Sequence, residues 1–406
     1  MYNSHLVLIS RNKSPNLFLL ISRLKTRALY KRFTSIFDTK DRVFGLDLMR
    51  FIAIILVVFG HVRWMTKGFP APIRALLHGS GILGVELFFV LSGFLIGGIL
   101  LKEFEKNNNS LDFSSIKNFW TRRWFRTLPN YYFILLIYIL VYFANKPNGL
   151  WRYFFFLQNV WNTPAYFFEE SWSLCIEEIS YLLSPLVLAL SAHVFKKDGK
   201  GNSKVFLWVS LFLIALVTAL RVIYCNNFLE PDYHWNTAVR EVAMIRLDAI
   251  YYGFVAVYFS RKYAEQWEGY KYPFFVAGTI GVLGLMAFQK KIVDLYPGII
   301  SNVVFFSALS VCIGFLLPLL ASIKTSKWEI LAKPITGISI ISYSMYLVNG
   351  GLISFTFMIH SNEGANWSVP FAALMYVVFW VLCISSSWLI YVLFEKPMTD
   401  LRNRFH

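Results

Sequence analysis

Residues 47–62 read DLMRFIAIILVVFGHV, a stretch with the apolar composition of a membrane helix. Arg50 lies near its start and His61 near its end. Ionisable side chains inside a membrane helix are costly and are usually retained for a function. The eleven-residue step between them is close to three helical turns, which places both side chains on nearly the same face, about 16 Å apart along the axis. This face is predicted to carry a fixed positive charge at one depth and a titratable imidazole at another.

Each of these two residues also has a plainer interpretation. An arginine near a helix start can extend its guanidinium to the membrane surface. A single histidine can simply make a hydrogen bond between helices. Neither interpretation explains why Arg50 and His61 occur together on one helix face.

The whole chain has the composition of a polytopic membrane protein. Of its 406 residues, 57% are hydrophobic and only 15% are charged, whereas about a quarter are charged in soluble domains. Apolar windows recur along the chain and predict an all-α bundle of about ten transmembrane helices. The predicted spans are roughly 46–63, 81–101, 127–144, 173–194, 205–224, 245–260, 272–289, 298–322, 335–359 and 369–393.

The distribution of basic residues predicts the orientation of these spans. With the N-terminus inside, the inner segments hold 28 Lys and Arg residues, whereas the outer segments hold 8 when Arg63 at the first boundary is included. Basic residues collect in cytoplasmic loops, so both termini are predicted to be cytoplasmic in a multi-pass protein of the cytoplasmic (inner) membrane. The same rule accounts for the net charge of +16 without a nucleic-acid partner.

The chain divides into a basic N-terminal segment, 1–44, and a transmembrane domain, 45–406. The first segment has no cleavable signal peptide of the usual form, and is expected to be an interfacial helix on the inner leaflet or a loosely ordered tail. The four cysteines have neither metal-like nor disulfide-like spacing and are interpreted as structural. No metal site is predicted.

A cluster of arginines precedes the third predicted span, in KNFWTRRWFRTLPN. Arg122, Arg123 and Arg126 lie at the predicted cytoplasmic boundary, and the last two are three residues apart on one helix face. Arginine grips phosphate and stacks on planar rings, so the cluster suits a ligand with phosphates and an aromatic base. The alternative is ordinary anchoring to lipid headgroups.

Two adjacent glutamates, Glu177 and Glu178, lie in SWSLCIEEISYLLSP within the fourth predicted span. Adjacent residues point about 100° apart on a helix, so only one can face a given site. Their candidate partners are Arg50, Arg246 and His61. The remaining candidates are assigned to substrate binding and are Glu86, Trp172, Arg246, Asp248 and Asn349.

Seven segments, taken together and in order, resemble the acyltransferase-3 family of integral membrane acyltransferases, which modify bacterial surface glycans. The segments are GLDLMRFIAIILVVFGH, GVELFFVLSGFLI, FWTRRWFRTLPNYY, SWSLCIEEISYLLSPL, RLDAIYYG, ISYSMYLVN and FEKPMTDLRNR. The resemblance covers the chain from about residue 45 to its end. It implies a bundle of about ten helices that uses cytoplasmic acyl-CoA as donor, with acetyl as the expected acyl group.

The resemblance also assigns residues to motifs. Arg50 and His61 match the Arg–His motif of the family, Arg123 and Arg126 match its Arg-x-x-Arg motif, and Glu177–Glu178 match its glutamate pair. Asn349 stands where many relatives have histidine, so a second histidine is not required here or has a different role. No esterase-like domain follows the last span, as it does in some members, and no acyl relay to such a domain is expected.

These observations predict an O-acyltransferase that acts on a hydroxyl of a cell-envelope glycan or a lipid-linked sugar. His61 would be the general base, and Glu177 or Glu178 would orient its ring. Arg50 would bind donor phosphate or an acidic partner, and Arg122, Arg123 and Arg126 would bind the phosphates of CoA. A covalent acyl-histidine intermediate and a homodimer both remain open. The alternative function is a proton-coupled secondary transporter of a small or lipid-linked solute, although no inverted repeat is evident.

Overall fold

The computed structural model describes residues 42–71, 74, 77, 79–142, 147–161, 167–195, 203–230, 232–296, 298–326, 328–361 and 367–402. Over these ranges the chain is helical and contains no strand. The predicted N-terminal segment 1–44 falls almost wholly outside the described residues. The longer helices are α2 (Phe44–His61), α4 (Ser80–Lys106), α5 (Phe113–Val141), α7 (Ser171–Val194), α8 (Lys204–Asn227), α9 (Asp248–Lys262), α11 (Lys271–Leu295), α12 (Phe305–Gly314), α14 (Glu329–Val348) and α16 (Val369–Ile390).

Shorter elements connect or extend these helices. They are η2 (Arg63–Thr66), α6 (Trp151–Phe154), η4 (Asn236–Arg240), η5 (Ala243–Ile245), α10 (Ala264–Gly269), η6 (Ile300–Val304), α13 (Leu317–Ser322), η7 (Asn349–Ser354), α15 (Phe355–His360), η9 (Tyr391–Glu395) and α17 (Lys396–Leu401). Among them η4, η6, η7 and η9 are π-helical turns. Turns of this kind are rare and often lie at functional sites.

The predicted bundle of membrane helices is confirmed. Within the described residues, nine helices are long and apolar enough to cross a membrane. The one predicted span without such a helix is 245–260. It corresponds to α9, which has only 15 residues and falls short of the roughly 20 that a full crossing needs. It is nevertheless well packed, because α4 lies against it along its length.

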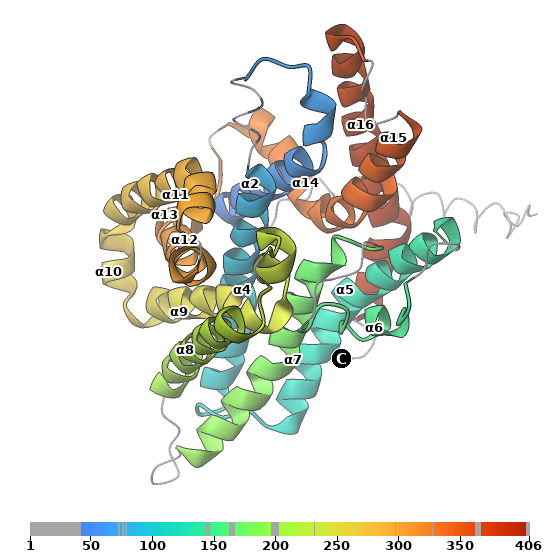
Figure 1. Ribbon diagram of the computed structural model, residues 1–406. Coiled ribbons are helices and arrows are strands. Elements are labelled where there is room, and N and C mark those ends of the chain that lie inside the picture. Colours follow the sequence, from blue (N-terminus) through green and yellow to red (C-terminus); the bar gives the residue numbers. More distant parts are fainter. Residues whose placement is uncertain are drawn as a thin grey trace, which may run out of the picture.

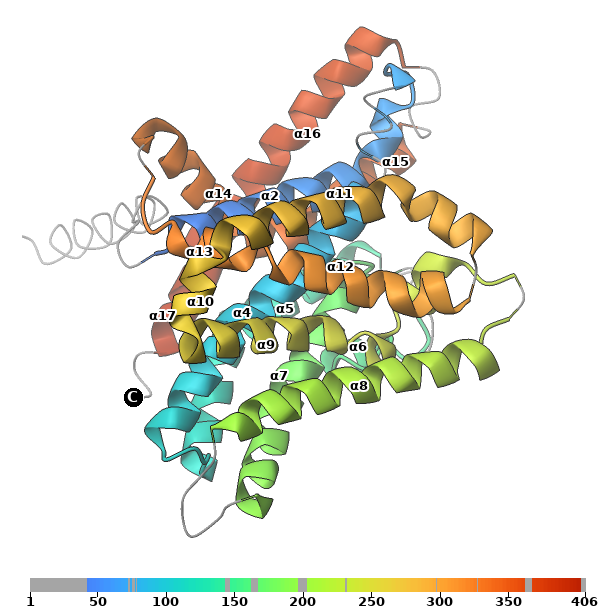
Figure 2. The same ribbon diagram turned by 90° about the vertical axis from the view of Figure 1, so that its left-hand side faces the viewer.

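Helix α2 lies inside the bundle, where it packs against α4, α13 and α14. The side view shows α11, α12, α9 and α8 as neighbouring rows (Figure 2). At the edge of the molecule, α16 extends away from this group, and half of its residues are exposed. The central position of α2 (Figure 1) lets residues at its two ends contribute to two separate cavities.

Helix α5 begins earlier than the sequence predicts. The third span was expected to start at residue 127, with the arginine cluster before it as a boundary segment. Instead one helix of 29 residues runs from Phe113, and Asp112 caps it by accepting a hydrogen bond from the Ser115 amide at 2.9 Å. The arginine cluster therefore lies within a helix, which fixes the spacing of Arg123 and Arg126.

Candidate active site

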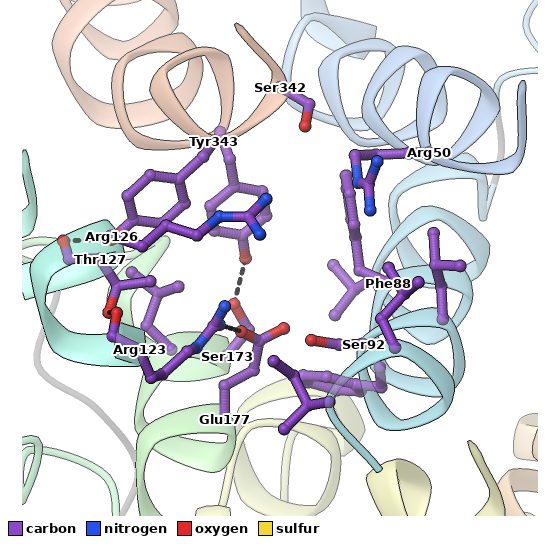
Figure 3. A pocket seen from close by; sticks show the side chains of 17 residues that line it. Arg50, Phe88, Ser92, Arg123, Arg126, Thr127, Ser173, Glu177, Ser342 and Tyr343 are labelled. Atoms are coloured by element: carbon purple, nitrogen blue, oxygen red, sulfur yellow. Dashed lines mark hydrogen bonds and ion pairs between the residues drawn. The ribbon is translucent and has the colours of Figure 1, made fainter. Parts of the chain in front are cut away.

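Three arginines from two helices surround a small cavity of about 110 Å³, which we call the arginine cavity. Arg50 of α2 faces it from one side, and Arg123 and Arg126 of α5 face it from the opposite side (Figure 3). Glu177 is the one acidic residue among the described residues that line it. The excess of guanidinium groups over carboxylates makes this cavity suited to an anion.

Arg50 and Arg123 have distinct environments beside the cavity. Arg50 donates from Nη1 to Asp47 Oδ1 at 3.0 Å and to Ser339 Oγ at 3.1 Å. Arg123 forms an ion pair with Glu177 at 2.9 Å, and its guanidinium carbon lies 4.2 Å from the centre of the Tyr181 ring. These contacts hold both planar groups in place beside the cavity.

The glutamate pair lies with the arginines and not with the imidazole, which corrects the sequence-based expectation. Glu177 pairs with Arg123 and lines the arginine cavity. Glu178 is buried and accepts a hydrogen bond from the Thr127 hydroxyl at 3.0 Å. The adjacent residues do point to different partners, as expected, but both partners belong to α5.

His61 lies at the C-terminal end of α2 and lines a second, larger cavity of about 570 Å³, which we call the histidine cavity. Its Nδ1 lies 2.5 Å from Oδ1 of Asn349. The amide nitrogen of Asn349 donates to the carbonyls of Met345 and Tyr346 at 2.8 and 2.9 Å. Because this fixes Oδ1 toward the ring, Nδ1 must carry the proton, and Nε2 keeps its lone pair to act as a base.

The helix around Asn349 is shaped by the sequence NGG. Two glycines weaken the α-helix here, and the chain continues from α14 as the π-turn η7. A β-carbon on Gly350 would lie 2.1 Å from Glu170 Oε1 and 3.1 Å from His61 Nδ1, so only glycine allows both groups to approach. The Ser354 hydroxyl further ties η7 to α2 by donating to the His61 carbonyl at 2.7 Å.

Glu170, just before α7, stabilises the turn η7 through hydrogen bonds. Its carboxylate accepts hydrogen bonds from the Gly351 amide and, at 3.0 Å, from the Tyr138 hydroxyl. Burial raises the pKa of the Glu170 carboxyl, against the lowering by these hydrogen bonds. Burial and the neighbouring Glu170 also raise the pKa of Glu169. Both residues line the histidine cavity.

A single layer of side chains separates the two cavities, since Val85 and Tyr346 line both of them. The Tyr346 hydroxyl shares a hydrogen bond with Ser173 Oγ. Its ring meets that of Phe88 edge to face, with centroids 6.1 Å apart. A group held in one cavity would therefore need to pass only this layer to reach the other.

The other predicted residues divide between the cavities and the core. Trp172 lines the histidine cavity, and its assignment to substrate binding stays a prediction. Glu86 and Arg246 form a fully buried ion pair, and so do Asp248 and Arg221. The linings of the two cavities do not include these four residues, so the structure places them as internal charge pairs rather than at a substrate surface. Arg122 is exposed on α5, outside the lining of the arginine cavity.

Several residues of the histidine cavity were not predicted from the sequence. Arg240, Glu241, Glu169, Glu170 and Trp235 all line it, from the chain before α7 and around η4. A signal was available for two of them, because Glu169–Glu170 is a second adjacent acidic pair only three residues before Ser173. Arg240 carries no such signal, since the sequence between the predicted spans 205–224 and 245–260 shows no periodicity.

A family model described as an acyltransferase domain matches residues 43–393 of this chain. The peptidoglycan O-acetyltransferase OatA of Listeria monocytogenes is 27% identical over 333 residues, which cover 77% of this chain and 49% of that protein. The O-acetyltransferase OatA of Staphylococcus aureus is 28% identical over 202 residues, which cover 45% of this chain and 30% of that protein. The chain thus spans half or less of the length of these relatives. No solved structure matches it.

Proposed function

The chain belongs to the acyltransferase-3 family, and we propose that it moves an acyl group, acetyl in the first instance, from acyl-CoA to a hydroxyl of a cell-envelope glycan. One observation carries this proposal. A cationic cavity and a cavity with an imidazole base lie on opposite sides of one layer of side chains. A donor and an acceptor could then meet from opposite directions. The names of the O-acetyltransferase relatives support the same type of reaction.

The arginine cavity would hold the acyl end of the donor. Its volume of about 110 Å³ lies well below the 300 Å³ or more that is typical of sites for drug-sized ligands. The thioester arm would therefore enter it, and the nucleotide would stay at its mouth. Arg123 and Arg126 would bind phosphates there, with Arg122 on the exposed face of the same helix. Arg50 of α2 would add a third positive charge on the opposite side of the cavity.

His61 would act as the general base. Nε2 would take the proton of an acceptor hydroxyl as its oxygen attacks the thioester carbonyl carbon. The tetrahedral adduct would then collapse, break the C–S bond and release CoA as thiolate, which recovers the proton from the imidazolium. Asn349 would hold Nδ1–H and the ring plane throughout, as the acid does in a catalytic triad. In this scheme Glu177 and Glu178 would position Arg123 and Thr127 of α5 beside the acyl-CoA site.

The charge distribution of the sequence supports an orientation for this reaction. With 28 basic residues on one side and 8 on the other, the arginine cavity would open to the cytoplasm, where acyl-CoA is made. The histidine cavity would face the outer side of the cytoplasmic membrane. The acceptor would be a wall glycan or a lipid-linked sugar, and its acylation would occur outside the cell.

The decisive experiment measures release of CoA from acetyl-CoA by the purified full chain in lipid nanodiscs. We expect slow release without acceptor, and a loss of about 100-fold or more in His61→Ala. His193→Ala, which removes an exposed histidine at the end of α7, is the matched control and should retain the wild-type rate. Arg123→Ala should raise KM for acetyl-CoA, and its rate of CoA release should recover at higher acetyl-CoA concentration.

The same assay separates the proposal from a proton-coupled transporter. A transporter neither consumes acyl-CoA nor releases CoA. If the wild-type chain does not turn over acetyl-CoA or a longer acyl-CoA, with or without envelope glycan fragments, the acyltransferase proposal fails.

A further inference from the structure

One wall of the histidine cavity is formed by the segment Trp235–Glu241, of sequence WNTAVRE, which includes the π-turn η4. The segment is anchored to the chain before α7. Asn159 accepts a hydrogen bond from the Ala243 amide at 2.8 Å, and its side chain donates to the Glu241 carbonyl at 2.6 Å. These bonds hold the segment in a defined position opposite His61.

Three buried polar atoms of this segment have no hydrogen-bond partner among the described residues. They are Nε of Arg240, Nε1 of Trp235 and Oδ1 of Asn236. Buried polar groups in proteins are nearly always paired. Three unpaired groups within six residues are therefore unusual, and they mark this wall of the cavity as polar.

Arg240 is the strongest of these groups. Its residue is only 8% exposed, and its guanidinium carbon lies 4.5 Å from the centre of the Trp172 ring. Its nearest carboxylate is that of Glu241, at 3.6 Å, which is longer than the roughly 2.7–2.9 Å of a charge-assisted hydrogen bond. The Arg240 guanidinium is thus oriented by the Trp172 ring, whereas its positive charge is only weakly compensated by the Glu241 carboxylate.

The other charged residues that line the cavity are hydrogen-bonded, exposed or partly neutral. Both carboxylate oxygens of Glu170 are engaged by Gly351 and Tyr138. Glu169 and Asp294 are exposed, as are the two further cations, Arg63 and Lys290. Burial raises the pKa of Glu241 to about 7, which reduces its charge near neutral pH and hence its competition for Arg240. Among the described residues that line this cavity, the buried cation is therefore Arg240.

We infer that Arg240 binds an acidic group of the acceptor, a carboxylate or a phosphate, and so selects an acidic sugar whose hydroxyl faces His61. The planar fork of arginine matches both groups in two-point contacts. Trp235 Nε1 and Asn236 Oδ1 would bind hydroxyl or amide groups of the same sugar. The inference rests on the proposed function, because it takes the histidine cavity as the acceptor site.

The test compares sugars that differ in one acidic group. N-acetylmuramic acid carries a carboxylate that N-acetylglucosamine lacks, and N-acetylglucosamine 1-phosphate carries a phosphate instead. Binding of each to the full chain in nanodiscs is measured by calorimetry. We expect the wild type to bind at least one acidic sugar about ten times more tightly than the neutral one, and the stronger of the two identifies the acid.

The preference should disappear in Arg240→Gln and be partly kept in Arg240→Lys, which retains the charge without the fork. Arg152→Gln is the matched control, because Arg152 also lies over a tryptophan ring, that of Trp151, but is exposed and outside the cavity lining. It should keep the wild-type preference. Gel filtration confirms that each variant is folded before binding is measured.

Equal affinity of the wild type for acidic and neutral sugars, binding of none of the three, or an unchanged preference in Arg240→Gln would overturn the inference. Release of CoA from acetyl-CoA by the wild type is measured on the same samples. Release without acid preference contradicts this inference alone. Acid preference without release contradicts the proposed function alone.

Discussion

At the scale of single residues, the central feature is a histidine whose ring is oriented by an amide. The bond from His61 Nδ1 to Asn349 Oδ1 joins residues 288 positions apart in the chain. A neutral partner fixes the tautomer, as a carboxylate would, but it adds no charge to stabilise the imidazolium. The catalytic contribution of Asn349 should therefore be large but smaller than that of His61.

The first prediction concerns this contact. In Asn349→Ala the ring loses the side-chain partner that holds Nδ1 in the described structure, so we expect kcat for CoA release to fall by about 10- to 100-fold. KM for acetyl-CoA should stay unchanged, because Asn349 does not line the arginine cavity. Steady-state kinetics on the purified chain measure both constants.

Asn227→Ala is the control for that prediction. Asn227 is exposed at the end of α8 and donates only to the Ile223 carbonyl, at 2.8 Å, among the contacts described. Its substitution should change neither constant. A kcat in Asn349→Ala equal to that of the wild type would mean that the amide does not orient the base.

The second prediction uses the carboxyl of Glu241, whose pKa burial raises from 4.5 to about 7 against the opposing effect of Arg240. Because the pKa is higher in the folded chain than in the unfolded chain, the folded state binds more protons between these values. The free energy of unfolding should thus fall as the pH rises from about 4.5 to 7, by at most about 3 kcal/mol from this group.

Glu241→Gln should remove that part of the pH dependence. Thermal unfolding of the detergent-solubilised chain between pH 5 and 8 measures it, with Glu230→Gln, at an exposed glutamate, as the control. We expect the decrease in Tm with rising pH to be smaller in Glu241→Gln than in the wild type and unchanged in Glu230→Gln. Parallel curves for all three proteins would show that Glu241 titrates at its ordinary value.

At the scale of elements, close helix contacts hold the wall of the active site in place. Helix α4 carries Val85 and Phe88 to the layer between the cavities and packs on α2 and α9. Without a hydrophobic force between helices in lipid, such packing depends on small residues that let backbones approach. A β-carbon on Gly93 would lie 1.9 Å from the Ile250 carbonyl oxygen of α9.

The third prediction follows from this contact. Gly93→Ala should force α4 and α9 apart and destabilise the protein by about 1–3 kcal/mol. Gly284→Ala in α11 is the matched control, since a β-carbon there meets no atom within 4 Å, and alanine favours a helix. Purified yield and Tm measure both effects. A Tm of Gly93→Ala equal to that of Gly284→Ala would mean that the two helices are not in close contact.

At the scale of the whole molecule, composition and periodicity predict the bundle well, because apolar runs and basic flanks are local properties of the sequence. They also place Arg50 and His61 on one face. They fail where function depends on contacts between distant segments. From the sequence, Glu177 or Glu178 was expected to orient the imidazole, whereas Asn349 contacts it in the structure and Glu177 pairs with Arg123. Arg240 belongs to η4, whose position at the histidine cavity is defined only by tertiary packing.

The last prediction tests the orientation on which a two-sided reaction depends. Lys67, in the turn after η2, lies six residues after His61, and Lys117 lies six residues before Arg123 on α5; both are exposed. If the histidine cavity faces the outside, Lys67→Cys should react with a membrane-impermeant maleimide in intact cells, and Lys117→Cys only after permeabilisation. Both variants are made in a chain whose four native cysteines are replaced by serine or alanine. The reverse pattern would place acyl-CoA and the arginines on opposite sides of the membrane, and the proposed direction of transfer could not hold.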